Sequence, residues 1–476
     1  MSNIGQFRAL LVLLLPLLLF NAASKADEMT APMEKTEQEA LYSAIQGFVG
    51  KAWNGSELYP DPCGWAPIQG VSCDLFDGLW YVTVLSIGPI LENSLECAWD
   101  AAFTNHLFEL KHLKSLTFYK CFSNTTHIPS QSWEKLAGSL ETLEFRSNRG
   151  LGGSVPAGIG RLASLHSLVL VDNGLMGELP QELGNLAGLK RMVLSENQLS
   201  GRIPASLGYA MAELLILDLS KNTLSGPVPA SLGGMSSLLK LDLSNNLLDG
   251  QLPIELGKLR NLTLIDLRNN KLSGGLAASL HGMASLQELL LSNNPLGGDI
   301  ADFTWGDMGN LTTVDLSNTG LGGRIPESMA ALDNLRFLAL DNNRLLGEVP
   351  PKLAALPMVG TLYLNGNNLT GRLEFSEGFY QRMGRRFAAW GNPNLCYSAA
   401  VDQSSGHAPT GVQQCKQPEG GPASNSAQKN DVGNGSTDQS SSPMVSLGFL
   451  ASSVDGFWWL VLLKQMVMAL LLALLL

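Results

Sequence analysis

Histidine and cysteine are the residues of this chain whose side chains are best suited to metal binding or nucleophilic chemistry. The sequence has six of each, and among the histidines only His106 and His112 lie close together. A zinc site needs several ligands at characteristic spacing, yet no second ligand cluster and no CxxC pair accompany these two. Hydrolase, metalloprotease, nucleotide-binding and kinase motifs are also missing from the sequence. We therefore expect no catalysis, no metal and no cofactor, and a solvated surface position for both histidines.

The cysteines instead predict disulfide bonds. An even number of cysteines in an oxidising compartment indicates a disulfide framework, although several connectivities remain possible. They cluster towards the two ends of the chain, and sequential pairing is the simplest arrangement: Cys63 with Cys73, Cys97 with Cys121, and Cys396 with Cys415.

Both termini suggest the secretory pathway. Residues 1–26 hold one arginine, a twelve-residue apolar run and small residues near Ala26, which is typical of a cleaved signal peptide. Residues 457–476 form a hydrophobic tail with one lysine, behind a spacer of small polar residues. This arrangement predicts a glycosylphosphatidylinositol (GPI) attachment signal, and a single-span membrane anchor is the alternative. We expect a plasma-membrane protein whose folded part lies outside the cell.

The net charge argues against a nucleic-acid binder and says little about protein partners. The formal net charge is −11, with no long run of one sign, whereas nucleic-acid binding normally requires a basic face. Asn-x-Ser/Thr triplets predict N-glycosylation of a secreted chain; they begin at Asn54, Asn124, Asn261, Asn310, Asn368 and Asn434.

The dominant feature is a repeat of 24 or 25 residues with the pattern LxxLxLxxNxLxGxxP, found in ten units. This period is the leucine-rich-repeat signature. In Leu241-Asp242-Leu243 the alternation is that of a strand, and the leucines must point inward to be buried by neighbouring repeats. The Leu-x-Gly-x-Ile/Val-Pro segments, such as residues 199–204, resemble the plant extracellular subclass. We therefore expect an α/β solenoid, a right-handed leucine-rich-repeat superhelix with disulfide-bonded N- and C-terminal caps.

Asparagines at the turn after each strand should form a ladder inside the solenoid. Their side-chain amides can satisfy backbone groups that a tight turn leaves unpaired. Thr319 occupies this position in one unit. A hydroxyl cannot reproduce an amide, so we expect a local irregularity at Thr319-Gly320.

A solenoid needs caps at both ends because its terminal coils expose apolar surface. Residues 36–39 form a predicted capping box that opens a helix, with Ala40, Leu41, Ala44, Ile45 and Phe48 at helical spacing. The expected plan is a signal peptide at 1–26, an N-terminal cap with an irregular first repeat at 27–139, ten repeats at 140–380, a C-terminal cap at 381–415, a flexible Ser/Gly/Asn-rich tether at 416–456 and the hydrophobic tail at 457–476.

Outward strand positions should form a concave binding face. The aspartates of the frequent LDLS spelling, for example Asp218 and Asp242, are readily explained as strand-edge residues. Arginine and aromatic side chains are enriched at binding hot spots. The candidate ligand-binding residues are therefore Arg146, Arg191, Arg268, Phe337 and Tyr363.

The cap segments ALYSAIQGFVG and WNGSELYPDPCGWAPIQGVSC, followed by LFELKHLKSLTFYKCF, closely resemble the plant Piriformospora indica-insensitive proteins. These are leucine-rich-repeat receptor-like proteins without a kinase, related to Too Many Mouths. The resemblance implies a cell-surface protein that recognises a protein, peptide or microbial ligand, acts with a partner receptor kinase, and responds to symbiotic or pathogenic fungi. The alternative is an inhibitor of a secreted cell-wall-degrading enzyme, similar to polygalacturonase inhibitors.

Overall fold

The structure is a computed structural model that describes residues 31–90, 93–276, 278–398 and 408–416. These residues belong to one compact unit, Met1–Gln417. The predicted signal peptide, the hydrophobic tail, nearly all of the tether and Asn434 lie outside the described residues. No helix within the described ranges is long and apolar enough to cross a membrane.

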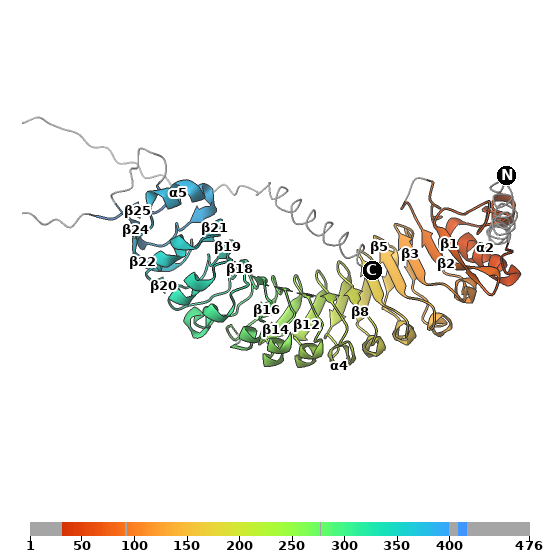
Figure 1. The fold of residues 1–476 in the computed structure, drawn as a ribbon, viewed down its shortest axis with the longest axis horizontal. Helices are drawn as coiled ribbons and strands as arrows, with labels where there is room; N and C mark the ends of the chain where they lie inside the picture. The colour runs from red at the N-terminus through yellow and green to blue at the C-terminus, as the bar shows by residue number, and fades with distance from the viewer. Residues whose placement is uncertain (1–30, 91–92, 277, 399–407, 417–476) are drawn as a thin grey trace, which may run out of the picture. The chain divides into compact units, whose positions relative to one another are not determined.

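The unit winds into a coil of repeats with one long sheet along its inner side (Figure 1). The β1–β2 pair is antiparallel and every later neighbour is parallel. In spatial order the fourteen strands are β1 (Val71–Phe76), β2 (Leu79–Ile87), β3 (Ser115–Tyr119), β5 (Thr142–Arg146), β7 (Ser167–Val171), β9 (Arg191–Val193), β11 (Ile216–Asp218), β13 (Lys240–Asp242), β15 (Leu264–Asp266), β17 (Glu288–Leu290), β18 (Thr313–Asp315), β19 (Phe337–Ala339), β21 (Thr361–Tyr363) and β23 (Phe387–Ala388).

Two shorter sheets follow the asparagine turns. One contains β4 (Thr126–His127), β6 (Leu151–Gly153), β8 (Gly174–Glu178), β10 (Gln198–Gly201), β12 (Thr223–Pro227), β14 (Leu247–Gly250) and β16 (Lys271–Leu272). The other contains β20 (Leu346–Gly347), β22 (Asn368–Leu373), β24 (Asn394–Tyr397) and β25 (Gln413–Gln414). These second strands are those of the plant extracellular subclass that the Gly and Pro pattern indicated.

Short helices return the chain along the outer side, where Figure 1 labels α4 (Ser206–Ala210). Helices α2 (Lys35–Val49) and α3 (Gly55–Leu58) belong to the N-terminal cap and α5 (Glu377–Met383) to the C-terminal end. The 3-10 helices are η1 (Asn105–Glu109), η2 (Trp133–Leu136), η3 (Ala157–Arg161), η4 (Gln181–Asn185), η5 (Ala230–Gly234), η6 (Ile254–Lys258), η7 (Ala278–Gly282), η8 (Ile300–Asp302), η9 (Trp305–Asp307), η10 (Glu327–Ala331), η11 (Pro351–Ala355) and η12 (Gly384–Arg386).

The leucine core is built as the repeat predicted. Leu241 and Leu243 are fully buried, while Lys240 and Asp242 between and beside them are only partly covered. Equivalent leucines stack in register from strand to strand, for instance Leu217, Leu241 and Ile265. Burial of repeated apolar side chains against their copies therefore stabilises the coil.

The asparagine ladder is present and runs one step further than predicted. Asn246 Nδ2 donates to the carbonyl oxygens of Leu219, Leu243 and Ser244, and its Oδ1 accepts from Leu224 N–H. Asn392, within the predicted C-terminal cap, makes the same kinds of bond, and β23 adds a further strand beside β21. The repeat geometry thus continues past its recognisable sequence.

The irregularity expected at Thr319 is confirmed. The Thr319 hydroxyl lies within hydrogen-bond distance of Leu316 O and Asn343 Oδ1, and Gly320 takes a positive φ of 72°. Leu296 N–H, which an amide at position 319 would bind, donates to Asn294 O instead. In this region the second strands are replaced by single bridges, Asp299 to Gly322 and Arg324 to Leu346.

Two disulfides lie near the N-terminal end of the solenoid and one near its C-terminal end. Their pairing is the predicted sequential one: Cys63–Cys73, Cys97–Cys121 and Cys396–Cys415.

The capping box predicted at residues 36–39 is wrong in one respect. Helix α2 begins at Lys35, and its N-cap is Glu34, whose carboxylate accepts from Glu37 N–H at 2.7 Å. A carboxylate can serve as well as a hydroxyl at a helix N-terminus, since it also opposes the positive end of the helix dipole. The predicted apolar face of α2 is buried as expected.

Glu37 is a carboxyl group buried inside the N-terminal cap. Its Oε1 accepts from Val82 N–H at 3.3 Å, and only 2% of the residue is exposed. Burial raises the pKa of Glu37 from 4.5 to about 7, against the opposing effect of that backbone hydrogen bond. The folded cap therefore favours the neutral acid.

We expect this acid to make cap stability fall as pH rises. The unfolded chain loses the proton near its ordinary pKa and the folded chain near 7, so folding is favoured at acidic pH and this advantage disappears between about pH 5 and 8. Glu37→Gln should remove about 2 kcal/mol of this pH dependence, with Glu39→Gln, exposed on the same helix, as the matched control. Urea unfolding at about pH 5 and about pH 8 measures the free energy of unfolding of each variant. If this free energy changed with pH in Glu37→Gln as much as in the wild-type chain, the prediction would be wrong.

Candidate functional site

The concave face consists of the outward side chains of the long sheet. These positions are mostly half-buried because each row is flanked by its copies on neighbouring strands. Their composition changes along the coil from arginine-containing, through alternating charges, to aromatic. The face therefore has three regions that a ligand could contact differently.

Arg146 and Arg191 lie in the first region. Arg146 forms an ion pair with Glu144 on the same strand, β5. Arg191 on β9 has a buried Nε without a hydrogen-bond partner. Burial, together with the neighbouring charge of Arg146, lowers the pKa of Arg191 from its ordinary value. Two predicted residues are thus electrostatically coupled, and Arg191 retains an unused donor.

The central region is a row of positive and negative side chains that neutralise one another. Lys240 Nζ lies 3.4 Å from Asp218 Oδ2 and 3.3 Å from Asp242 Oδ2. Burial lowers the pKa of Lys240, but the two carboxylates outweigh it and the net shift is upward. Burial, then Asp218 and Asp266, raise the pKa of Asp242. The lysine therefore stays charged and holds together carboxylates that would otherwise repel.

Arg268, a predicted ligand-binding residue, completes this row of charges. Its guanidinium pairs with the buried carboxylate of Asp266, the last residue of β15, which precedes Arg268 by two positions. Arg268 Nη2 lies 2.6 Å from Asp266 Oδ2. Burial lowers the pKa of Arg268, and the bond to Asp266 more than reverses that shift. Along the sheet, Arg268 lies between the other two arginines and the aromatic residues.

The LDLS aspartates have a structural role, as the simpler interpretation held. Asp218, Asp242 and Asp315 each accept from the backbone N–H and the hydroxyl of the serine two residues later. Each carboxylate thus closes the turn that leads from strand to asparagine. This explains why the spelling recurs without reference to a ligand.

The third region brings together two of the predicted residues. Phe337 on β19 and Tyr363 on β21 lie edge to face, with ring centroids 6.0 Å apart. Trp390, two residues after β23, is 50% exposed, and its carbonyl accepts from Gly366 N–H. Trp390 was missed because the predicted repeats stopped at Asn367. Extending the 24- or 25-residue register once more, to Asn392, identifies it.

The two histidines that lie close together in the sequence have different surroundings. His106 lies at an exposed position 3.3 Å from Glu109, and His112 stacks on Phe76 with ring centroids 4.1 Å apart. In the part of the chain that the structure describes, no group of three or more potential ligands could hold a metal ion. His106 therefore has the expected solvated position, whereas His112 is half-buried against Phe76 and Tyr81.

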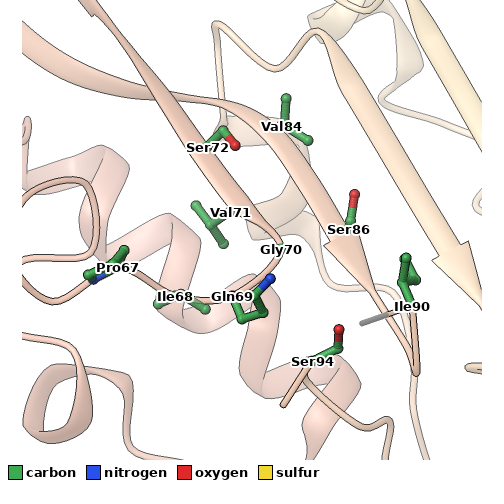
Figure 2. A pocket seen from close by; sticks show the side chains of 10 residues that line it. All are labelled: Pro67, Ile68, Gln69, Gly70, Val71, Ser72, Val84, Ser86, Ile90 and Ser94. Atoms are coloured by element: carbon green, nitrogen blue, oxygen red, sulfur yellow. The ribbon is translucent and has the colours of Figure 1, made fainter. Parts of the chain in front are cut away.

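A shallow cavity of about 360 Å³ lies in the N-terminal cap. Figure 2 shows Val84 and Ser86 on β2 beside Val71 and Ser72 on β1, with Ile90 on the following loop. The described residues of its lining include no ionisable side chain, so none of them could act as a general acid or base. We take the concave face, rather than this cavity, as the candidate site.

Comparison with known proteins identifies the fold and its relatives. Residues 112–397 match the family model described as a leucine-rich repeat region. Piriformospora indica-insensitive protein 2 of Arabidopsis thaliana is 66% identical over 394 residues, which cover 82% of this chain and 93% of that protein. The chain belongs to the Piriformospora indica-insensitive family of leucine-rich-repeat proteins.

Two further comparisons place this family member among plant receptors. Protein TOO MANY MOUTHS of Arabidopsis thaliana is 34% identical over 141 residues, 28% of this chain and 27% of that protein. The solved structure of plant peptide hormone receptor RGFR1 in complex with RGF2 superposes with a TM-score of 0.53 at 27% identity, covering 64% of this chain and 51% of the receptor chain. The chain is a plant leucine-rich-repeat receptor-like protein that spans about half the length of that receptor structure.

The predicted glycosylation sites of this family member are accessible where the structure describes them. Asn54, Asn124, Asn261, Asn310 and Asn368 are all exposed. Asn261 and Asn310 each donate from Nδ2 to a carbonyl of the preceding repeat, Ser236 O and Ala284 O. None of the five is an outward position of the long sheet, so glycans there would leave the concave residues themselves unmodified. Their occupancy stays a prediction.

Proposed function

We propose that this protein is a cell-surface receptor-like protein that binds a protein, peptide or microbial ligand on its concave face. It then acts through a partner receptor kinase. The observation that carries this proposal is the group of Phe337, Tyr363 and Trp390 at one end of a sheet face whose centre holds structural aspartates and serines and the paired Lys240 and Arg268. Half-exposed aromatic residues are typical anchors of protein interfaces.

Family membership supports the biological setting. The relative at 66% identity is named for insensitivity to Piriformospora indica, and the superposed receptor binds a peptide hormone. We therefore place the protein in the plant response to symbiotic or pathogenic fungi. A chain that lacks kinase motifs needs a partner to signal, and receptor kinases are the natural candidates.

Membrane attachment is the second part of the proposal. The signal peptide and the tail at 457–476 support a GPI anchor on the extracellular face of the plasma membrane. Phospholipase C treatment of intact plant cells should release the protein into the medium. If the protein stays on the membrane, it is anchored by a single transmembrane span rather than by a lipid. If it is found in the cytosol, the whole proposal is wrong.

A co-precipitation experiment tests the partner. The full chain, tagged within residues 416–456, is expressed in plant cells and purified from membranes with and without a fungal extract. We expect a receptor kinase to co-purify, and to do so more strongly after treatment. If no kinase appears and the purified chain instead slows a fungal pectinase, the protein is an inhibitor of a cell-wall-degrading enzyme and the receptor proposal is wrong.

A further inference from the structure

The aromatic region of the concave face differs from the centre in its charge balance. In the centre, Lys240 and Arg268 each pair with neighbouring aspartates. From β18 to β23, the outward positions hold two carboxylates, Asp315 and Asp341, three aromatic rings and one cation, Arg386, which lies just before β23 in the row of Phe337. The exposed Arg386 guanidinium donates from Nη2 to Arg382 O, and no ion pair joins it to either carboxylate. Asp315 and Asp341 therefore lack the lysine or arginine partner that the central aspartates have.

Asp341 is the unusual member of this group. It occupies the row in which the preceding repeats have Ser292 and Ser317, so it is no part of the LDLS turn. Its Oδ2 accepts from Asn342 Nδ2 at 2.7 Å. Burial first, and repulsion from Asp315 in addition, raise the pKa of Asp341, while its hydrogen bonds act in the opposite direction. A nearby positive charge would relieve this repulsion, whereas a neutral ligand would not.

The rings lie beside this carboxylate. Asn342 N–H donates to Asn365 O, and Gly366 N–H donates to Trp390 O, so Asp341, Asn365 and Trp390 form one row across β19, β21 and the end of β23. Tyr363 precedes Asn365 by two residues on the same side of its strand, and Phe337 packs edge-on against it. Faces of Tyr and Trp rings attract Lys and Arg side chains, especially where a carboxylate lies nearby.

We propose that this region, Asp341 with Tyr363 and Trp390, is the subsite for a lysine or arginine side chain of an extended peptide ligand. Four strands at about 4.8 Å spacing give a platform about 14 Å long, enough for roughly four extended residues. The cationic group of the peptide lies over the Tyr363 and Trp390 rings and pairs with Asp341. Phe337 packs edge to face against Tyr363 and so fixes the orientation of that ring. This inference rests on the proposed function and specifies the chemistry of its ligand.

Phage display tests the subsite directly. The detergent-solubilised full chain is panned against random peptides of about nine residues, and wild-type protein should enrich sequences with Lys or Arg at one fixed position. Asp341→Asn, which removes the charge and keeps the shape, should abolish this preference. Asp249→Asn, an exposed carboxylate on β14 outside the concave face, is the matched control and should retain it. For one enriched peptide, replacing Arg by citrulline should weaken binding about fivefold or more.

The possible outcomes separate this inference from the receptor proposal. Enriched peptides without a common cation, or a cation preference that survives in Asp341→Asn, would overturn the subsite and leave peptide binding intact. Wild-type chain that enriches no peptide, but binds oligosaccharides on an array in a Tyr363-dependent manner, would overturn the peptide ligand as well. Loss of Arg and Lys enrichment in Asp341→Asn alone would establish the subsite.

Discussion

Asn246→Ala should destabilise the solenoid by about 3–5 kcal/mol, because several buried backbone groups lose their partner at once. The Asn246 amide binds the carbonyls of Leu219, Leu243 and Ser244 and the N–H of Leu224. The Asn246 side chain is only 6% exposed, so water has little access to the groups that it binds. Leaving a buried polar group unsatisfied costs about 1–3 kcal/mol, and the carbonyl groups keep other bonds, which limits the total.

The chain provides two controls for this experiment. Thr319→Ala changes the ladder position that already lacks an amide, so only one hydroxyl is lost and the cost should be about 1 kcal/mol. Asn334→Ala removes an exposed side chain with one bond, to Gly309 O, and should cost less than about 1 kcal/mol. Urea unfolding measures all three. Equal destabilisation by Asn246→Ala and Thr319→Ala would show that the ladder contributes little to stability.

The comparison of the predicted with the observed structure shows which features a repeated sequence reveals and which it does not. A fixed period reports which side chains must be buried in register, so the leucine core, the ladder and the weak point at Thr319 were all predictable. It also indicated which faces of the strands point outward. The period is informative because the same physical requirement, burial against a copy, is imposed at each repeat.

Features made by one coil alone left no periodic signal. Trp390 follows Phe387 and Ala389, where the usual leucines are replaced, so the last turn of the ladder went unrecognised. The N-cap at Glu34 uses a carboxylate in place of the expected hydroxyl. Arg268 was predicted as a ligand-binding residue, and its pairing with Asp266 could not be predicted because it depends on a side-chain conformation that the sequence does not express. Surface pairing, unlike burial, is decided locally.

Replacement of both Phe337 and Tyr363 by alanine should reduce recovery of the co-purifying receptor kinase at least tenfold. Paired aromatic side chains at the centre of an interface typically contribute about 2 kcal/mol or more each, and here each ring also holds the other in place. The backbone bonds and buried leucines of β19 and β21 are untouched, so the melting temperature should change little. Tyr209→Ala with Ile254→Ala removes comparable area from exposed positions on α4 and η6 and should leave recovery unchanged. If the Phe337/Tyr363 variant folds and is secreted normally and the kinase is still fully recovered with it, the binding surface lies outside the concave sheet.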